Sequence, residues 1–441
     1  MKHRFLALLL CGCMLCGVAG CAGEESVGGT NEVTQIPIEY LADGELPEQN
    51  SETIDLMDGI QLMSVEPEGD LPEYPITTFG VELLQNTLQQ AKKNENVLVS
   101  PMSAWTVLCM VEAGAYGETK KQMQDVLAIT EGDYLTYAKK FTFELPKKDG
   151  CEVHMANGIW YKNAPYFHVQ KEFLEYNKTF FDAAAYQAPF NESTLNNIND
   201  WVEKNTDGMI PEILEEIKEE DVIYLVNALS FDAKWSTIYK EDQIARDMFT
   251  TENGTQKVAA FMNCEENVYL EDENTTGFMK YYGDGQYAFV ALLPREGMTV
   301  AEYVESLTAE GLWTLFQNKS NTKVSTMLPK FFVEYDLKMN DILQQMGMTD
   351  AFSVADADFS RMATSDAGNI YISSVDQKCF IAVDESGTKA GAATAVTMAN
   401  KMMLERRKEV FLKRPFVYMI VECDKYEPLF MGTIMNVEEA K

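Results

Sequence analysis

The sequence has little histidine and none of the common catalytic motifs. Its 441 residues include three histidines, of which His154 and His168 lie outside the N-terminal segment. Neither has a serine or cysteine elbow beside it, and no Gly-x-Ser-x-Gly occurs. No Cys/His spacing is typical of zinc, and no glycine-rich loop is suited to a phosphate. We therefore expect no catalytic residues, no metal and no cofactor, and we predict that the protein is not an enzyme.

Basic residues are few compared with acidic ones. The chain has 36 Lys and Arg against 69 Asp and Glu, a formal net charge of −33 at pH 7. This charge repels polyanions, so nucleic acid, heparin-like chains and anionic membrane surfaces are not expected as partners. It would favour a basic partner, although solubility alone explains most of it.

The N-terminal apolar run is too short and too early to span a membrane, and it has the pattern of an export signal. A basic start precedes apolar residues 5–16, and small residues stand directly before Cys21. This ending resembles the lipobox of bacterial lipoproteins, in which the cysteine is lipidated. An ordinary cleaved signal with an incidental Cys21 is the alternative. We expect residues 1–20 to be a lipoprotein signal peptide and Cys21 to anchor an exported protein at the cell surface.

Residues 21–75 contain no Lys or Arg and no sustained apolar periodicity. After the lipidated cysteine, this composition is typical of an acidic, disordered tether. Residues 54–63 have enough apolar side chains to dock somewhere, but no structure is predicted for them. The membrane would be contacted through the lipid anchor only.

Residues 76–441 contain no internal linker or repeat, so we expect one domain. Strand-like and helix-like stretches alternate without a regular βαβ order, which favours an α+β fold. This part holds an odd number of widely spaced cysteines, which does not form a disulfide framework. We expect free thiols at Cys109, Cys151, Cys264, Cys379 and Cys423.

The most informative segment is residues 385–398, which is low in bulk and charge. Read with a period of two, one set of positions carries no charge and could enter a packed interior. That set is Thr388, Ala390, Ala392, Thr394, Val396 and Met398. The other set carries the single charge, Lys389, and could stay outside. Taken alone, the segment is better explained as an alanine-rich helix or a plain flexible loop, and an element that can be both an exposed loop and a buried strand is the alternative.

Together with its neighbours, this segment resembles the hinge and reactive loop of the serpins, the serine protease inhibitors. Further motifs resemble that family in the same order along the chain. They are Asn96-Val97-Leu98-Val99-Ser100-Pro101, Ala156-Asn157-Gly158-Ile159-Trp160, Val226-Asn227-Ala228-Leu229-Ser230-Phe231, Leu328-Pro329-Lys330-Phe331 and Phe430-Met431-Gly432. The resemblance covers about residues 77–437.

The resemblance implies the serpin fold, with three β-sheets, about eight to nine helices and an exposed reactive-centre loop. It also implies roles for particular residues. The hinge would comprise Glu385, Gly387, Thr388, Ala390, Gly391, Ala392 and Ala393. The shutter beneath the parting strands would include Ser100, Ser103, Asn227 and Gln377, and Trp235 would lie in the breach where insertion starts. Gln377 stands where many serpins have histidine, so an altered pH response is expected.

The bond that a protease would cut is less well defined. Family spacing from the hinge gives Lys401-Met402, whereas counting back from residue 415 gives a bond near Leu404-Glu405. A trypsin-like target suits Lys401, and an elastase-like or chymotrypsin-like target would suit Met402, Met403 or Leu404. Arg406 and Arg407 are further basic candidates.

We therefore expect a monomeric, surface-anchored inhibitor of serine proteases that acts as a suicide substrate. In this mechanism the cleaved loop inserts into the central sheet while the protease is still esterified. One alternative is a non-inhibitory serpin that acts as a binding or surface-interaction protein. Another is a cross-class inhibitor of papain-like cysteine proteases.

Overall fold

The computed structural model describes residues 52–64, 73–130, 132, 134–143, 145, 151–218, 221–366, 368–388 and 408–437. In these residues the chain forms helices α1 to α9, three larger β-sheets and one two-stranded sheet. The predicted α+β class and the three-sheet arrangement are confirmed.

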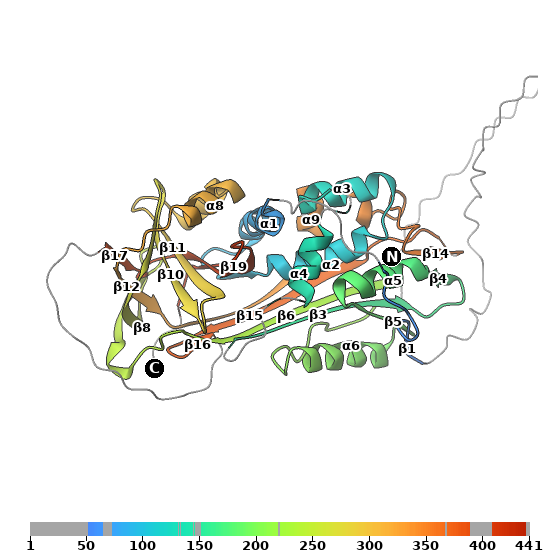
Figure 1. The fold of residues 1–441 in the computed structure, drawn as a ribbon, viewed down its shortest axis with the longest axis horizontal. Coiled ribbons are helices and arrows are strands. Elements are labelled where there is room, and N and C mark those ends of the chain that lie inside the picture. Colours follow the sequence, from blue (N-terminus) through green and yellow to red (C-terminus); the bar gives the residue numbers. More distant parts are fainter. Residues whose placement is uncertain are drawn as a thin grey trace, which may run out of the picture. The chain divides into compact units, whose positions relative to one another are not determined.

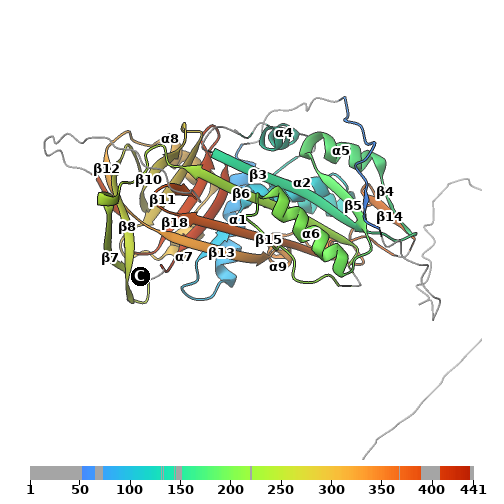
Figure 2. The same ribbon diagram turned by 90° about the horizontal axis from the view of Figure 1, so that it is seen from below.

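The largest sheet, here called sheet A, has seven strands. In spatial order they are β1 (Ile54–Asp55), β5 (Ala184–Ala188), β3 (Cys151–Lys162), β6 (Ile223–Lys234), β16 (Gly387–Thr388), β15 (Ser374–Val383) and β13 (Phe331–Lys338). Figure 2 shows the long strands β3, β6, β15 and β13 side by side, with α6 lying across them. Along β15 half-buried and buried residues alternate strictly, as expected when one face of a strand packs on a core.

The second sheet, sheet B, has six strands and lies beneath α1 and α8 (Figure 1). In spatial order the strands are β2 (Val97–Val99), β19 (Pro428–Ile434), β18 (Phe416–Glu422), β11 (Tyr287–Pro294), β10 (Thr275–Tyr282) and β9 (Val268–Glu271). Every residue of β11, β18 and β19 is buried. The apolar run at residues 415–421 predicts a buried strand, and β18 confirms it.

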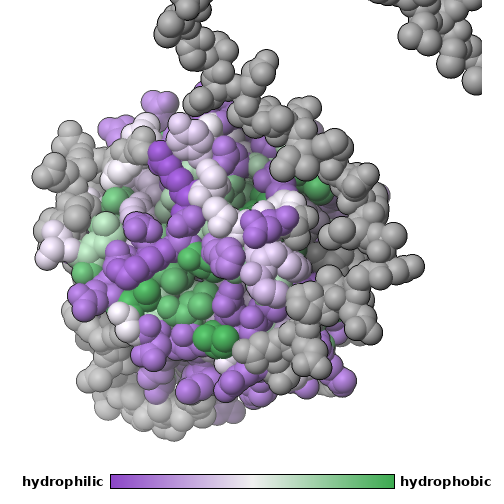
Figure 3. All heavy atoms as spheres, turned by 90° about the vertical axis from the view of Figure 1, so that its right-hand side faces the viewer, coloured by the Kyte–Doolittle hydropathy of each residue, from purple (hydrophilic) through white to green (hydrophobic). Residues whose placement is uncertain are grey.

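The remaining strands form two smaller sheets. Sheet C contains β17 (Lys408–Phe411), β12 (Val324–Pro329), β8 (Gln256–Glu266) and β7 (Ile244–Thr250), and the two-stranded sheet contains β14 (Ala363–Ser365) and β4 (Phe167–Val169). The end of the molecule that carries β4 and β14 is mainly hydrophilic around a smaller group of hydrophobic side chains (Figure 3).

The helices begin where the sequence supplies start signals. Proline stands at the first position of α1 and α2, where its missing N–H costs nothing. Asn191 caps α6 in a reciprocal capping box with Thr194. The helices are α1 (Pro75–Gln90), α2 (Pro101–Glu112), α3 (Gly117–Leu127), α4 (Leu135–Phe143), α5 (Lys171–Phe181), α6 (Glu192–Asn205), α7 (Val300–Ser306), α8 (Ala309–Gln317) and α9 (Asn340–Met346), with short 3₁₀ turns η1 (Glu241–Gln243) and η2 (Asp350–Phe352). Contacts join both α2 and α6 to the strands β3 and β6 of sheet A.

Part of the predicted tether is structured. In residues 52–64, β1 pairs with the edge strand β5. The Lys178 ammonium on α5 donates to the carbonyls of Met57 and Ile60, at 3.0 and 2.8 Å. The sequence predicts no secondary structure for this segment, although its apolar side chains at residues 54–63 indicate that it could dock on a folded part of the chain. Residues 52–64 therefore pack against the domain that the sequence predicts to begin at residue 76.

Candidate functional site

The candidate site is the opening in the middle of sheet A. Strands β6 and β15 pair directly only at one end, where Tyr224–Val226 align in parallel with Ser374–Asp376. Beyond that point residues 227–232 pair with β3 on their outer side, and residues 377–382 pair with β13 on theirs. In this described stretch no residue pair joins their inner sides. Two central strands that are paired at one end and parted further along can accept another strand between them.

The first residues of such a strand are already in place at the other end of the opening. Thr388 pairs with Val383 of β15 and with Ala233 of β6, so that β16 lies between the two strands. Figure 1 shows β16 at the left end of these strands. Thr388, the first residue that the sequence assigns to the inward set, is 2% exposed. Its hydroxyl is 2.6 Å from the Tyr282 hydroxyl. Burial raises the pKa of Tyr282 well above its usual value, so the phenol stays a neutral hydrogen-bonding partner.

Gly387 is required by the close approach of its backbone to β6. A Cβ at this position would lie 2.0 Å from the carbonyl oxygen of Ala233. No side chain fits at that separation, so any other residue would force β16 away from β6.

Trp235, the predicted breach residue, holds the turn between β15 and β16. Its backbone N–H donates to the carbonyl of Ser386 at 2.9 Å, and its indole Nε1–H donates to the carbonyl of Asp384 at 2.8 Å. The ring stacks on Tyr282, with centroids 4.3 Å apart and planes 15° apart. A single tryptophan thus contacts both the turn and the aromatic ring that receives Thr388.

Glu385 fixes the same turn from the outside. Its carboxylate forms an ion pair with Lys330, and its carbonyl accepts from the N–H of Tyr239 at 2.9 Å. Partial burial opposes ionisation, but the hydrogen bond and charge of Lys330 outweigh it and hold the pKa of Glu385 below its usual range. Lys330 belongs to the motif Leu328-Pro329-Lys330-Phe331, and its partner Glu385 is evident from the fold and not from the sequence.

The predicted shutter residues lie where β6 and β15 part. Gln377 is the first residue of β15 beyond the direct pairing, and its side chain bonds the backbone of Ser100 twice at 2.9 Å, accepting from the N–H and donating to the carbonyl. On β6 the first residue beyond the direct pairing is Asn227, whose side-chain amide donates to Asn157 Oδ1 at 2.5 Å. The Ser100 hydroxyl donates to the carbonyl of Leu429.

Buried polar atoms without partners lie along the same stretch of β6. Asn227 Oδ1 and Ser230 Oγ are buried and have no hydrogen-bond partner among the described residues. Leaving such atoms unpaired costs on the order of 1–3 kcal/mol each. Ser103, in α2, is also buried. Asn227 and Ser230 are three residues apart in one strand, so their side chains lie on opposite faces of sheet A.

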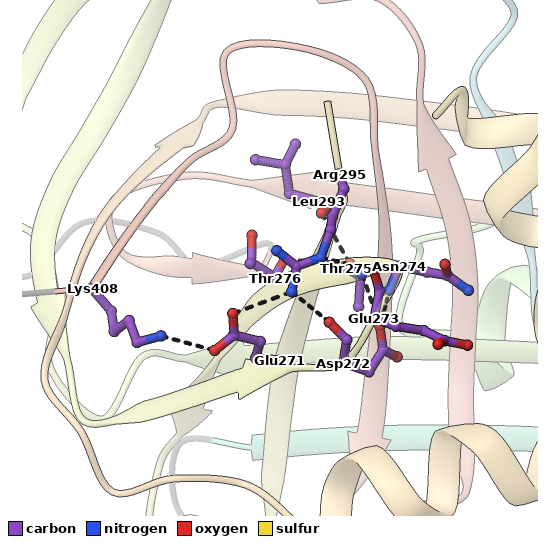
Figure 4. Close-up of polar contacts among 9 residues, drawn as sticks. All are labelled: Glu271, Asp272, Glu273, Asn274, Thr275, Thr276, Leu293, Arg295 and Lys408. Carbon is purple, nitrogen blue, oxygen red and sulfur yellow. Dashed lines mark hydrogen bonds and ion pairs between the residues drawn. The ribbon is translucent and has the colours of Figure 1, made fainter. Parts of the chain in front are cut away.

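The segment that follows β16 is tied at its far end to sheet C. Lys408 begins β17, which pairs in parallel with β12, and its ammonium lies 2.8 Å from Glu271 at the end of β9 (Figure 4). The hydrogen bond from Lys408, helped by Arg295, holds the pKa of Glu271 below its usual range. Arg295 also donates to the carbonyls of Asp272 and Glu273, at 2.6 and 2.8 Å. Residues 388 and 408 thus belong to different sheets.

Several predicted positions lie outside the described residues. These are the hinge residues Ala390, Gly391, Ala392 and Ala393, the candidate reactive bond Lys401-Met402 and the lipidation candidate Cys21. Cys151, Cys264, Cys379 and Cys423 are free thiols, and Cys109, Cys151 and Cys379 are buried. His154 lies in β3 and His168 in β4, on separate elements.

In the part of the chain that the structure describes, no group of His, Cys, Asp or Glu side chains could hold a metal ion. Within the same residues, no helix has both the length and the apolar character needed to cross a bilayer.

The sequence reasoning missed three side chains that surround the hinge. They are Tyr282, Tyr239 and Lys280, which lie outside the motifs quoted for the family. No periodicity marks them, because their role arises from contacts between β10, the segment after β6 and the turn at residues 384–387. Only the two neighbouring tyrosines at 281 and 282 give a weak aromatic signal.

Comparisons with known proteins agree with this geometry. The family model described as "Serpin (serine protease inhibitor)" matches residues 75–437. An uncharacterized serpin-like protein of Thermococcus kodakarensis is 31% identical over 374 residues, which cover 82% of this chain and 85% of that protein.

Among solved structures, two states of the thermophilic serpin Tengpin match at 40% identity. The native state has a TM-score of 0.82 and covers 88% of this chain and 100% of that chain. The latent state has a TM-score of 0.73 and covers 84% of this chain and 100% of that chain. The arrangement described above is therefore more similar to the native state than to the latent one.

Proposed function

Because the chain belongs to the serpin family, whose members are typically protease inhibitors, we propose that it traps serine proteases as a suicide substrate. The protease would attack the loop that connects β16 with β17. The cleaved loop would then lengthen β16 down the opening of sheet A and carry the esterified protease with it.

The observation that supports this proposal is the state of sheet A. Thr388 and Gly387 already lie between β6 and β15, and beyond them the two strands are parted down to the direct pairing at residues 224–226 and 374–376. Completing the sheet would pair the inner sides of both strands, which favours insertion once the chain is free to move. A sheet without this opening would have no place for the loop.

Cleavage is the step that would free the chain. The intact segment is held at one end by β16 in sheet A and at the other by β17 and Lys408 in sheet C. The protease serine Oγ would attack the loop carbonyl, the amide C–N bond would break, and the new amine would take a proton and stay with β17. The acyl ester would stay on the β16 side. Deacylation would stall if insertion distorts the protease before water attacks the ester.

The predicted inward residues suit such a step, because none is charged. An unpaired charge in the interior costs several kcal/mol, whereas threonine and alanine can enter a strand easily. The target is proposed to be trypsin-like, since Lys401 fits the acidic specificity pocket of such enzymes, with elastase-like enzymes as the second choice.

We further propose that the protein is an exported monomer anchored at the cell surface through lipidated Cys21. The resemblance of the N-terminus to a lipobox supports this placement. Metabolic labelling with a fatty-acid analogue, compared between the full chain and Cys21→Ala, would test it. Label on both proteins, or on neither, would contradict it.

The trapping mechanism can be tested directly with protein that starts at residue 22. It would be mixed separately with trypsin and with pancreatic elastase, and analysed on denaturing gels. We expect a complex that survives denaturant, with a released C-terminal peptide whose mass places the cut at Lys401 or a few residues later. Protease with a blocked active-site serine should form no such complex.

Complete cleavage by both enzymes without any complex would contradict trapping of these two classes. It would favour a non-inhibitory serpin or a target of another class. A complex with papain, which has a cysteine nucleophile, would favour cross-class inhibition.

A further inference from the structure

A buried lysine lies next to the hinge and has no role in the function proposed so far. Lys280, on β10, is 3% exposed. Its ammonium lies 2.7 Å from Glu266 Oε1, at the end of β8, and 3.2 Å from the carbonyl oxygen of Thr237. Lysine is almost never fully buried unless it is paired, and replacing buried ion pairs by apolar residues is often neutral or stabilising. Stability alone is therefore a weak explanation for this pair.

The same ammonium contacts two aromatic rings. It lies 4.3 Å from the ring centroid of Tyr239 and 5.3 Å from that of Trp235. Both are within the range of cation–π attraction, which strengthens when the cation is removed from water. The ring centroids of Trp235 and Tyr239 are 6.5 Å apart, and the two rings meet edge to face. One buried cation thus fixes the positions of both rings.

These two residues hold the turn that leads into β16. The N–H of Tyr239 donates to the carbonyl of Glu385, and Trp235 donates to the carbonyls of Asp384 and Ser386. Three successive carbonyls of the turn are therefore bonded to residues that pack around Lys280. The N–H groups of Ser386 and Gly387 are in turn bonded to the Asp384 side chain, at 2.7 and 3.2 Å.

The position of this turn determines the register of any strand that follows it. Thr388 lies between Val383 and Ala233 because the chain reverses at residues 384–387. If β16 lengthens, every later residue enters in the register set here. A slip by one residue would exchange the two faces of the strand, so that Lys389 would turn into the core and the small uncharged set would turn out.

We propose that Lys280 is a positioning residue for loop insertion. Paired with Glu266, it holds Trp235 and Tyr239 so that the turn at 384–387 fixes the register in which the cleaved loop enters sheet A. This inference rests on the proposed trapping function. Lys280 would then raise the fraction of loop cleavages that end with a trapped protease, and lower the fraction in which the protein is cleaved as an ordinary substrate.

The test compares Lys280→Met with a matched control. Lys120→Met also removes a lysine from a largely buried ion pair, since Lys120 lies 3.7 Å from Glu112, with side chains 15% and 2% exposed. That pair joins α3 to α2. For each variant one measures the stoichiometry of inhibition, the rate of first loop cleavage and the melting temperature.

We expect Lys280→Met to raise the stoichiometry of inhibition several-fold while the rate of first cleavage stays at the wild-type value. Lys120→Met should change the melting temperature but not the stoichiometry. Lys280→Arg should retain most of the trapping activity that Lys280→Met loses, because the guanidinium keeps the positive charge and can stack on aromatic rings.

The double variant Lys280→Met/Glu266→Gln separates the loss of the cation from the creation of an unpaired buried carboxylate. An equal rise in stoichiometry in the single and double variants would support the role of the cation. A wild-type stoichiometry in Lys280→Met, or an equal rise in Lys120→Met, would overturn the proposal.

If the wild-type protein is cleaved by every protease without trapping, the proposed function fails, and the inference is judged by another readout. After cleavage, insertion is followed by the rate at which the protein gains thermal stability. We expect a slower gain in Lys280→Met than in the wild type and in Lys120→Met. Equal rates would contradict the positioning role even then.

Discussion

Sheets A and B differ in how completely their strands are paired. In sheet B, β18 aligns with β11 on one side and with β19 on the other along nearly its whole length, and all its residues are buried. In sheet A, residues 223–233 of β6 pair with β3 and residues 376–383 of β15 pair with β13, but β6 and β15 meet directly over only three residue pairs. The strands of sheet B are paired with their neighbours, whereas among the described residues sheet A has unpaired inner edges on β6 and β15, where we propose that the cleaved loop inserts.

The largest expected effect comes from a charge at the start of the inserted strand. Thr388→Arg would place a guanidinium where the side chain is 2% exposed and bonded to Tyr282. Burying it unpaired costs several kcal/mol, so we expect the variant to be cleaved without trapping. Titration of a fixed amount of protease measures this as loss of the denaturant-resistant complex.

Thr388→Val is the matched control, because it keeps the shape of the side chain and removes about one hydrogen bond, worth about 1 kcal/mol. It should trap with a modestly raised stoichiometry. If Thr388→Arg still trapped protease at the wild-type stoichiometry, burial of this position would not be part of the mechanism.

A second prediction concerns a carboxyl group beside sheet B. Glu427, just before β19, is fully buried and accepts hydrogen bonds from the N–H and hydroxyl of Thr77 in α1. Burial, with a further contribution from Glu422, raises its pKa to about 8. The folded state therefore holds a proton that the unfolded state loses near pH 4.3. This group's contribution is complete below that pH and is lost as pH rises toward 8 and above.

Glu427→Gln keeps the hydrogen-bond acceptor and cannot ionise. We expect the variant to be more stable than the wild type by a few kcal/mol at pH 9, with a smaller difference at pH 5. Denaturant unfolding at the two pH values measures it. A difference that is the same at both pH values would show that ionisation of Glu427 does not limit the stability of this region.

The third prediction compares two glycines that meet a neighbouring strand closely. A Cβ on Gly432 in β19 would lie 2.4 Å from the carbonyl oxygen of Val97, and one on Gly387 would lie 2.0 Å from that of Ala233. Gly432→Ala must disturb a closed sheet, at a cost of roughly 1–3 kcal/mol. Gly387→Ala can be relieved by displacing β16, so it should lower trapping more than stability. The reverse pattern would contradict the distinction between the sheets.

The smallest effect is expected at the shutter. Gln377 bonds both the N–H and the carbonyl of Ser100 and carries no charge at any pH. A Gln377→His variant would offer an acceptor only while the imidazole is neutral. We expect its melting temperature to fall between pH 7 and pH 5 by the equivalent of about 1 kcal/mol, relative to the wild type. Parallel pH profiles would contradict this role of the side chain.

The fold could be predicted largely from the sequence, because its signals are local. The apolar run at 415–421 predicts the buried strand β18, and the ordered family motifs predict the α+β architecture with three sheets. The uncharged set beginning at Thr388 indicates which face of the hinge can be buried. The strand and the buried face of the hinge follow from neighbouring residues, whereas the three-sheet architecture follows from the resemblance to the serpins.

The contacts that surround the hinge could not be predicted in this way. Lys280 looks like an ordinary exposed strand lysine until β10, β8 and the segment after β6 come together around it. The ion pair of Lys330 with Glu385 joins residues that are far apart in the chain. The docking of residues 52–64 likewise depends on the free edge of β5. Such pairings arise from tertiary structure, and no local pattern records them.

The most direct test of the account is the stability of sheet A before and after loop cleavage. Protein cleaved in the loop would be compared with intact protein by thermal unfolding and by hydrogen exchange at residues 227–232 and 377–382. If the loop completes the sheet, cleavage should raise the melting temperature well above that of the intact protein and protect the amides in both segments. Equal melting temperatures with unchanged exchange would contradict the central claim that sheet A is left open for this strand.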